Sequence, residues 1–411
     1  MKLRRAIAPL FVTLALTPWV VAQNNTSQRQ TILSGGKPWT GSNRMAQSGR
    51  TLSPSFSSSV ATRENQQVKY KVVQIGVLPG KTNSFLPDLK SINNLGHAAG
   101  YSFTYKPGDF NNLFRTGQAF IWQDGKLKAL PLLPGWAGAF GFALNDLDQV
   151  VGVASNVDAD QTVHQTPVLW NRGQPINLGS LFPGQNSYAS GINFWGVVVG
   201  GSALPDNSGN NAPWVWYGGA LHALPFLSGM NHGFAEAIND FGVIAGRQGS
   251  IDDSSGVPCL WYWNGIGYTP VSLGSFGGDF GDAVGINNLG HTTGWSLLSG
   301  DIHGPAFISD FRGLHALPQL PSDTDGGGNQ ISDTDEITGW SQLFDDQGNF
   351  ISQRVVIWQN GKVTELNTLV PPNIPTFEDI GNANILGQIS ASAGLLSDGT
   401  ETTYILTPII H

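Results

Sequence analysis

The sequence predicts an all-β fold: a seven-bladed β-propeller made of four-stranded blades, with the last blade completed by the N-terminal strand. Three observations predict it. A short motif, Ile-Asn followed by a turn that usually contains glycine, recurs in seven copies, some of them degenerate. Only 12% of the residues are charged, while there are 53 glycines and 13 tryptophans, which is typical of sheets joined by tight turns. Finally, the repeated region begins and ends with part of a repeat, which indicates that its two ends meet in one sheet.

Residues 1–22 have the order of a secretory signal peptide. Three basic residues within the first five positions precede an uncharged apolar run from Ala6 to Val21, and Ala22 is a small residue suited to cleavage. A membrane anchor is the alternative, although two prolines interrupt the run and it is short for a bilayer span. We therefore expect a secreted product, extracellular or periplasmic, with no membrane span.

Residues 23–67 predict a disordered polar leader. They are rich in Ser, Asn, Gln, Thr and Gly and show no apolar periodicity. Such a segment buries too little apolar surface to offset the entropy lost on ordering. We expect residues 68–411 to form the propeller.

Charge and cysteine content narrow the possible partners. The formal net charge is −8, and Lys and Arg form no cluster, which argues against nucleic acid and anionic lipid as partners. Cys259 is the single cysteine, so no internal disulfide forms and the core alone must hold the fold. We expect a monomer.

The second residue of the motif marks one phase in every repeat. The seven marker residues are Asn93, Asn145, Asn193, Asn239, Asn287, Ser332 and Asn384. Their spacing ranges from 45 to 52 residues, a length typical of propeller blades. Solenoid repeats are usually shorter or helical, and the repeats show no helical stripe.

Each repeat divides into four strands, A to D. Strand A runs into Ile-Asn, and strand B is the apolar segment after the turn, such as Val150–Val153. Strand C is a run such as Ala119–Trp122, and strand D extends from Leu127 to Leu133. Asp-Gly and Asn-Gly pairs between C and D supply the positive φ of tight hairpins. We interpret the Asn of the A-to-B turn in the same way, as a backbone requirement.

The two ends of the repeated region complement each other. The corner Leu78–Gly80 resembles the corners that follow strand D elsewhere, so Tyr70–Leu78 is a strand D with no A, B or C before it. Thr403–Pro408 falls where strand C belongs, with little chain left for a D. The N-terminal strand therefore completes the last blade, which removes two sheet edges.

Two repeat units carry a family resemblance. Residues 70–102 and 273–296 show the order strand, corner, Ile-Asn-x-x-Gly-x-x-x-Gly. This order resembles the extracellular HAF repeat family of bacteria, from Val68 to the C-terminus. The His-Ala-Phe that names the family is replaced here, for example by Gln118-Ala119-Phe120. The resemblance implies export and repeats, and brings no defined activity with it.

Several residues recur at equivalent positions, which predicts structural roles for them. Tryptophans at the ends of strands C point to packing between blades. These are Trp122, Trp170, Trp216, Trp261 and Trp358. Phe140, Tyr188 and Phe234 each lie five residues before a marker, and His97 and His291 share one turn position. We interpret all of them as repeated structure.

Residues that break the repeat are the candidates for ligand binding. The connections from D to A and from B to C emerge on one face of a propeller, around the channel mouth, where ligands usually bind. Candidates there are Trp136, His232, Asp279, Asp282 and His303, with an insertion at 105–115. Aromatic rings beside carboxylates stack on sugar rings and bond their hydroxyls, with ordinary loop packing as the alternative.

The sequence motifs give little support for metal binding or for catalysis. Residues 323–326 and 333–336 are acidic enough to suggest Ca²⁺, but they lack the twelve-position loop with a terminal Glu, so a solvated loop is the competing interpretation. We predict no other cofactor. The sequence contains no Gly-x-Ser-x-Gly, no His-Glu-x-x-His and no phosphate loop.

Two functional hypotheses remain. The first is a non-catalytic binding scaffold that recognises a glycan or an extracellular protein at one face of the propeller. The second is a polysaccharide lyase or glycoside hydrolase, with His232 as base and Asp279 or Asp282 assisting. A fold alone does not decide between them.

Overall fold

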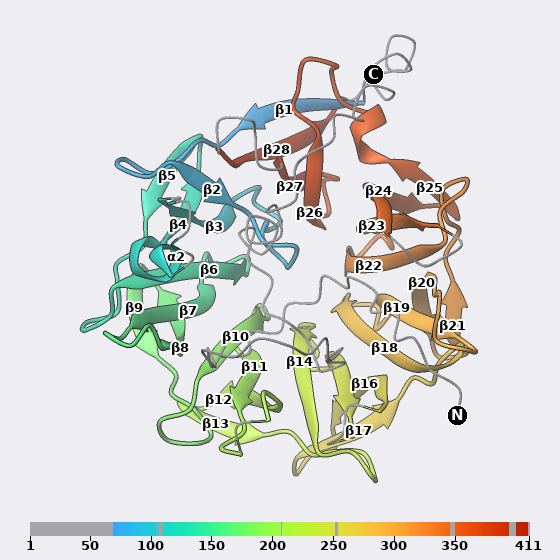
Figure 1. Ribbon diagram of the computed structural model, residues 1–411, viewed down its shortest axis with the longest axis horizontal. Helices are drawn as coiled ribbons and strands as arrows, with labels where there is room; N and C mark the ends of the chain where they lie inside the picture. Colours follow the sequence, from blue (N-terminus) through green and yellow to red (C-terminus); the bar gives the residue numbers. More distant parts are fainter. Residues whose placement is uncertain are drawn as a thin grey trace, which may run out of the picture.

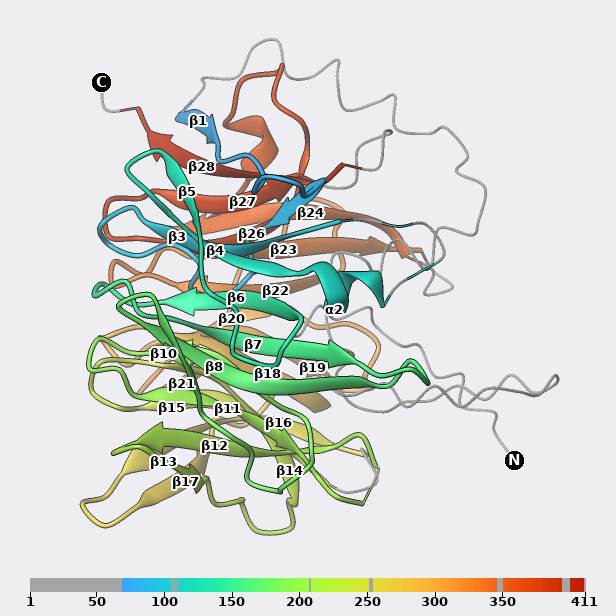
Figure 2. The same cartoon turned by 90° about the vertical axis from the view of Figure 1, so that its left-hand side faces the viewer.

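The chain folds into an all-β propeller. The computed structural model describes residues 69–409 except 105, 107–108, 110, 207, 251–253, 346–349 and 394–399. Sheets stand radially around a central axis, and the strands of each sheet run along that axis (Figures 1 and 2). The predicted signal peptide and polar leader lie outside the described residues.

Each repeat contributes four strands, as the sequence predicts. In ring order they are β2 (Asn83–Phe85), β3 (Ala98–Phe103), β4 (Gln118–Gln123) and β5 (Lys126–Ala129); β6 (Gly138–Leu144), β7 (Val150–Val157), β8 (Val163–Asn171) and β9 (Gln174–Asn177); β10 (Ser187–Ile192), β11 (Val198–Ala203), β12 (Asn211–Tyr217) and β13 (Ala220–Ala223); β14 (His232–Ile238), β15 (Ile244–Gly249), β16 (Gly256–Trp263) and β17 (Tyr268–Ser272); β18 (Gly277–Ile286), β19 (Thr292–Leu298), β20 (Ala306–Asp310) and β21 (Gly313–Ala316); β22 (Asp325–Ile331), β23 (Ile337–Phe344), β24 (Phe350–Gln359) and β25 (Lys362–Glu365); and β26 (Phe377–Ala383), β27 (Ile389–Ala393), β28 (Thr402–Pro408) and β1 (Tyr70–Gln74).

The sheets are not all separate, which differs from the seven separate sheets that we predicted. Within the described residues, five sheets have four strands each, and a sixth has eight. The eight-stranded sheet joins the repeats β14–β17 and β18–β21 through one parallel pair, Gly256 with Phe280. Strand β18 begins early, at Gly277, and this extension brings its backbone beside the start of β16. No sequence signal marks this bridge.

The two ends of the repeated region meet in one sheet. Strand β1 pairs antiparallel with β28, with Tyr70 opposite Pro408, in the sheet order β1-β28-β27-β26. Figure 1 shows the blue strand β1 beside the red strand β28. The predicted closure by the N-terminal strand is therefore present. Both β1 and the predicted strand D at Leu127–Leu133 are shorter than expected. In the latter, Pro131 lacks the N–H needed to continue the ladder.

The marker asparagines link neighbouring repeats, which corrects our interpretation of them. Their φ values are not positive; in five of the A-to-B turns a glycine takes that conformation, and Asp148 and Asp335 take it in the other two. Instead, each Asn side chain donates Nδ2–H to the backbone carbonyl of the next marker, over 2.9 to 3.1 Å. Asn384 closes the circle by donating to Asn93, and Ser332 lacks the amide for such a bond.

Tryptophans of the third strands tie the outer parts of the ring together. The indole Nε1–H donates to a proline carbonyl of the preceding repeat in three cases: Trp170 to Pro131, Trp261 to Pro225 and Trp358 to Pro318. Each acceptor follows the fourth strand of its own repeat, and these three indoles are at most 2% exposed. The predicted role of these residues between repeats is confirmed. Trp122 and Trp216 are half-buried in the same kind of interface.

Candidate functional site

A pocket opens on the axis of the ring, where the A-to-B turns converge. Its volume is about 820 Å³, including the open space at its mouth. The seven residues that directly follow the markers all line it, and we call them the rim residues. They are Asn94, Asp146, Phe194, Asp240, Asn288, Asp333 and Ile385. The first strand of each repeat lies nearest the axis (Figure 1), and the A-to-B turn of each repeat places one rim residue at the mouth.

Hydrogen bonds hold the polar rim residues in place. Asn94 donates from its backbone N and from Nδ2 to the two oxygens of Asp146, both over 2.8 Å. Asn288 Nδ2 donates to Asp240 and to Asp333, over 2.9 and 3.0 Å. The three carboxylates are half-buried. A carboxylate oxygen accepts more than one hydrogen bond, so these groups are positioned and still able to accept from a ligand.

The pocket carries an excess of negative charge. Its acidic lining residues are Asp146, Glu236, Asp240 and Asp333, and among the described lining residues Lys90 is the one basic side chain. Negative charge in a recessed site attracts cations and hydrogen-bond donors. The site therefore suits an amine, a guanidinium or a hydroxyl-rich ligand.

A buried charged cluster lies next to the pocket. Glu236 sits at a bulge in β14, where the register shifts between Ala235 and Ala237, and it is 1% exposed. Neither of its carboxylate oxygens accepts a hydrogen bond within the described chain. Burial, and then the negative charge of Asp282, raises the pKa of Glu236 well above its usual value, against the opposing influence of Arg247. A carboxyl group that keeps its proton near neutral pH can donate that proton.

Asp282 and Arg247 form the other half of this cluster. Arg247 Nε lies 3.8 Å from Asp282 Oδ2, and the guanidinium lies over the Phe234 ring at 4.6 Å from its centroid. Burial raises the pKa of Asp282 in spite of Arg247. Asp282 lies five residues before its marker, the position that is aromatic in three other repeats. Asp88 and Asp379 occupy the same position in two further repeats, so a carboxylate there is a recurring alternative to a ring.

An insertion in the first repeat reaches the axis. Strand β2 ends at Phe85, and its hydrogen bonding to the neighbouring strand β3 resumes only at Ser91, whose carbonyl accepts from the backbone N of Ala99. Within the intervening segment, Leu89 lines the pocket and also packs in the cluster that contains Phe142 and Phe234. Figure 1 shows this blue segment extending toward the centre of the ring. The pocket thus meets the apolar core at Leu89, and Lys90 follows directly.

The five predicted binding residues do not line this pocket. Trp136 packs half-buried against the apolar cluster that contains Trp170. His232 is 3% exposed, and Asp282 belongs to the buried charged cluster. Asp279 is exposed, and its backbone N donates to Asp301 Oδ1. His303 Nδ1 lies 2.8 Å from Asp325 Oδ2.

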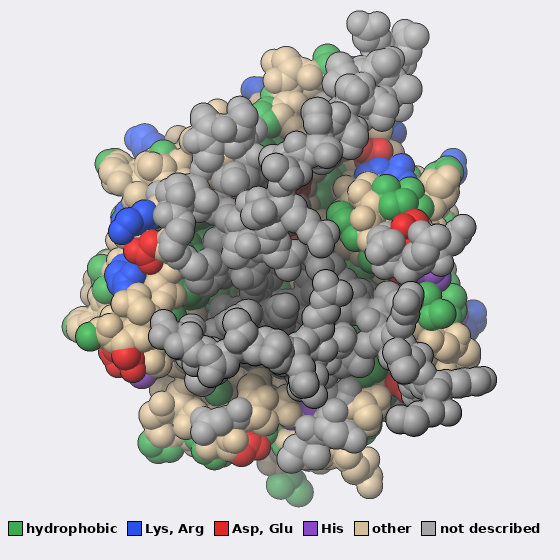
Figure 3. Space-filling view, in the orientation of Figure 1, with side chains coloured by type: hydrophobic (Ala, Val, Ile, Leu, Met, Phe, Trp, Pro, Cys, Tyr) green, Lys and Arg blue, Asp and Glu red, His purple; other side chains and the backbone are tan. Residues whose placement is uncertain are grey.

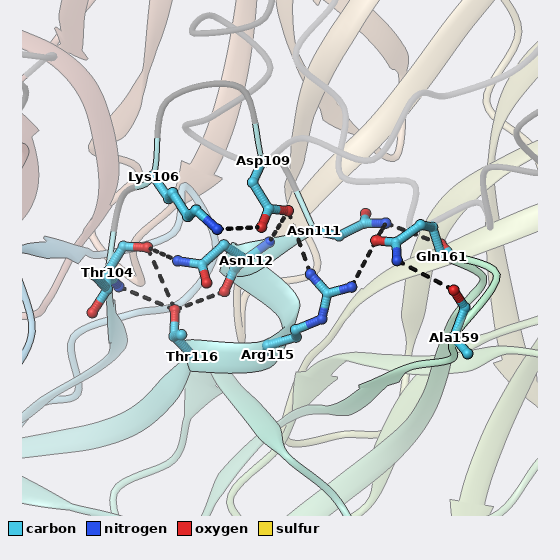
Figure 4. Close-up of polar contacts among 9 residues, drawn as sticks. All are labelled: Thr104, Lys106, Asp109, Asn111, Asn112, Arg115, Thr116, Ala159 and Gln161. Atoms are coloured by element: carbon cyan, nitrogen blue, oxygen red, sulfur yellow. Dashed lines mark hydrogen bonds and ion pairs between the residues drawn. The ribbon is translucent and has the colours of Figure 1, made fainter.

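The predicted insertion at 105–115 forms structure of its own on the opposite face. It contains the short helix α2 (Asn112–Thr116), which buries Leu113 and Phe114. Figure 4 shows Arg115 reaching Asp109 and Gln161, which tethers the insertion to the next repeat. A helix was not expected here. In Figure 3 basic and acidic side chains alternate around the border of this face.

The acidic segments considered for Ca²⁺ have separate partners. Asp323 pairs with Arg354, Asp325 with His303, Asp333 with Asn288, and Asp335 with His291. Within the part of the chain that the structure describes, no three His, Cys, Asp or Glu side chains gather as metal ligands would.

The site that we missed has a recognisable signal. The rim residues directly follow the markers, and Asn, Asp, Phe and Ile share this position across the repeats. The markers themselves are nearly invariant, and the variation begins one position further along each turn. The pocket was recognisable from the alignment of repeats, but the placement of Glu236 beside Asp282 depends on a bulge that the sequence does not reveal.

Comparisons with known proteins support no functional assignment. No protein-family model matches the chain, and no curated protein matches it. Among solved structures, the chain is similar to a Mycobacterium tuberculosis puromycin-hydrolyzing peptidase, with 10% identity, a TM-score of 0.47, and coverage of 84% of this chain and 55% of that one. It is also similar to the β-propeller domain of the Trilobed protease from Pyrococcus furiosus, with 8% identity, a TM-score of 0.45, and coverage of 80% and 94%.

A third similar structure is a gluconolactonase from Xanthomonas campestris, with 10% identity, a TM-score of 0.36, and coverage of 84% of this chain and 91% of that one. Identities this low transfer no activity, substrate or site residue. Among the described residues, no helix combines the length and apolar composition needed to cross a membrane.

Proposed function

We propose that this chain is a secreted, non-catalytic binding propeller whose ligand, a glycan or an extracellular protein, occupies the axial pocket between the A-to-B turns. The observation that carries the proposal is the polar rim: one residue per repeat, three carboxylates among them, around a recess of about 820 Å³. The binding face is then opposite to the one that we expected from the sequence.

The number of blades, the family and export of the chain also belong to this proposal. We count the eight-stranded sheet as two blades, because each half has four antiparallel strands of its own and one parallel pair joins them, which makes seven blades. We place the chain with the extracellular HAF repeat family on the motif of its repeats. Export rests on the signal-like residues 1–22.

Arrays of glycans and of peptides, probed with the full exported chain, test the proposal. A ligand found there should bind the Asp240→Asn variant at least tenfold more weakly, because a rim charge is lost. Asp124→Asn is the matched control: Asp124 is an exposed carboxylate in a C-to-D turn with φ 50°, which Asn also tolerates, and it does not line the pocket. No ligand on either array, or equal binding by both variants, would overturn the proposal.

A second candidate function is cleavage of a polysaccharide, either by hydrolysis or by the elimination reaction of a lyase. The buried pair of Glu236 and Asp282 favours it, because two carboxyls with raised pKa values can serve as acid and base. This replaces the role first considered for His232 as base. Release of reducing or unsaturated sugars that disappears in Glu236→Gln, while the variant stays folded, would support catalysis; undiminished release would exclude Glu236 as the catalytic group.

A further inference from the structure

A ring of exposed apolar side chains surrounds the axial pocket. In six repeats the residue directly after the rim residue is large and apolar, and we call these six residues the crown. They are Leu95, Leu147, Trp195, Phe241, Leu289 and Leu386. Each is between 58% and 76% exposed. Turn tips exposed to water are usually polar, and apolar residues repeated around one opening mark an interaction surface.

The crown is aromatic over two neighbouring repeats. Phe194 and Trp195 pack edge to face with ring centroids 5.2 Å apart. Trp195 Nε1 donates to the carbonyl of Asp240 over 3.0 Å, so the indole leans across to the turn that carries Phe241. This hydrogen bond fixes a largely exposed ring. A ring held in place loses little entropy on binding, and tryptophan is enriched among residues that dominate binding energy.

Charge selects the partner that this surface accepts. Asp240 lines the pocket, and its backbone carbonyl accepts the hydrogen bond from the Trp195 indole; Glu236, buried and without a hydrogen-bond donor, lines the pocket in the same repeat. Anionic partners, including acidic lipid surfaces, are repelled by the three rim carboxylates, which Lys90 offsets only in part. A cation beside aromatic faces gains both an ion pair and a cation–π contact. Apolar neighbours of that cation would cover the leucines of the crown.

We propose that the crown and the pocket together form a docking surface for a polypeptide segment that presents one lysine or arginine flanked by apolar residues. The basic side chain enters the pocket at Asp240, and its neighbours rest on Trp195, Phe241 and the crown leucines. The inference rests on the proposed binding function and specifies the partner class for that site.

Selection of a random heptapeptide library against the full chain tests this docking surface. Enriched peptides should contain Lys or Arg between apolar residues, and should bind Trp195→Ala, Phe241→Ala and Asp240→Asn at least tenfold more weakly than the wild type. Phe311→Ala is the control, since Phe311 is 90% exposed on the same face but lies in the turn between β20 and β21, outside the A-to-B turns that carry the crown. Its binding should be unchanged.

The outcomes separate this inference from the broader proposal. Enriched peptides without a basic residue, or equal binding by the crown variants and Phe311→Ala, would overturn the docking surface. Glycan binding that is lost in Asp240→Asn, without any peptide enrichment, would leave the axial site standing and overturn the polypeptide partner. Sedimentation with phosphatidylcholine vesicles that Trp195→Ala abolishes would assign the crown to a membrane surface instead.

Discussion

In six of the seven repeats, one hydrogen bond made by an asparagine side chain links the A-to-B turn to that of the next repeat. The Asn marker accepts backbone N–H groups of its own turn at Oδ1 and donates Nδ2–H to the next marker. Ser332 Oγ accepts hydrogen bonds from the backbone N–H groups of Thr334 and Glu336, as Oδ1 of an Asn marker does. Serine has no side-chain amide that could also donate to the next marker. The circle of inter-repeat bonds is therefore open at this position.

Ser332→Asn should close that circle. The new amide would reach the carbonyl of Asn384, as Asn287 now reaches that of Ser332, and we expect a gain of about 1 kcal/mol in the free energy of unfolding. Asn239→Ser is the reciprocal change and should cost a similar amount or more. Urea unfolding measures both. A loss of stability in Ser332→Asn would show that these bonds do not strengthen the ring.

Glu336 predicts a pH dependence of stability. Burial raises its pKa from the usual 4.5 to about 7. A raised pKa in the folded state means that the folded protein binds the proton more tightly, so this contribution to stability is complete below about pH 4.5 and is lost as the pH rises to about 7. Glu336→Gln carries no such titration. Its stability relative to the wild type should rise by at most about 3 kcal/mol between these pH values, and a pH-independent difference would contradict the assignment.

At the scale of single elements, recurrence in the sequence was the reliable guide. It predicted the four strands per repeat, the C-to-D hairpins and the tryptophans between repeats. Pairs of residues in different repeats were harder to see: His97 lies 2.8 Å from Asp148, and His291 lies 2.9 Å from Asp335. In both cases an Asp stands where other repeats have Gly, and the repeat before it supplies a His. The recurring histidines were correctly interpreted as structural, although their partners lie about one repeat away.

The tryptophan contacts give a test at this scale. Trp261→Phe keeps most of the apolar area but removes the shorter of two hydrogen bonds to the carbonyl of Pro225, which then keeps only Gln248 Nε2 as a donor, over 3.4 Å; we expect a loss of about 1 kcal/mol in unfolding free energy. Trp216→Phe is the control, because within the described chain the Trp216 indole makes no such bond and is only half-buried. Equal losses in the two variants would assign the effect to packing alone.

At the scale of the whole molecule, the ring depends on a contact between the first and last strands of the repeated region. Strand β1 adds Tyr70 to the apolar cluster of the last sheet, and β28 alone would leave that sheet with an open edge. Removing residues 69–78 should therefore abolish cooperative urea unfolding or lower its midpoint strongly. An unchanged midpoint would show that closure adds nothing to stability.

Sequence periodicity predicted this closure because it concerns where repeats begin and end. It did not predict which face carries the pocket, because that depends on how the insertion around Leu89 and the bulge at Glu236 occupy the axis. Nor did it reveal the bridge between Gly256 and Phe280, which is made by backbone atoms of two residues with no special signal. Local departures from an otherwise regular ring are decided by tertiary packing.

The most direct test of the account is a crystal structure of the full chain with a ligand from the arrays or the peptide library. If the axial pocket is the binding site, electron density for the ligand will lie on the ring axis, among the A-to-B turns and in contact with Asp240. Density on the opposite face, near α2, would contradict it.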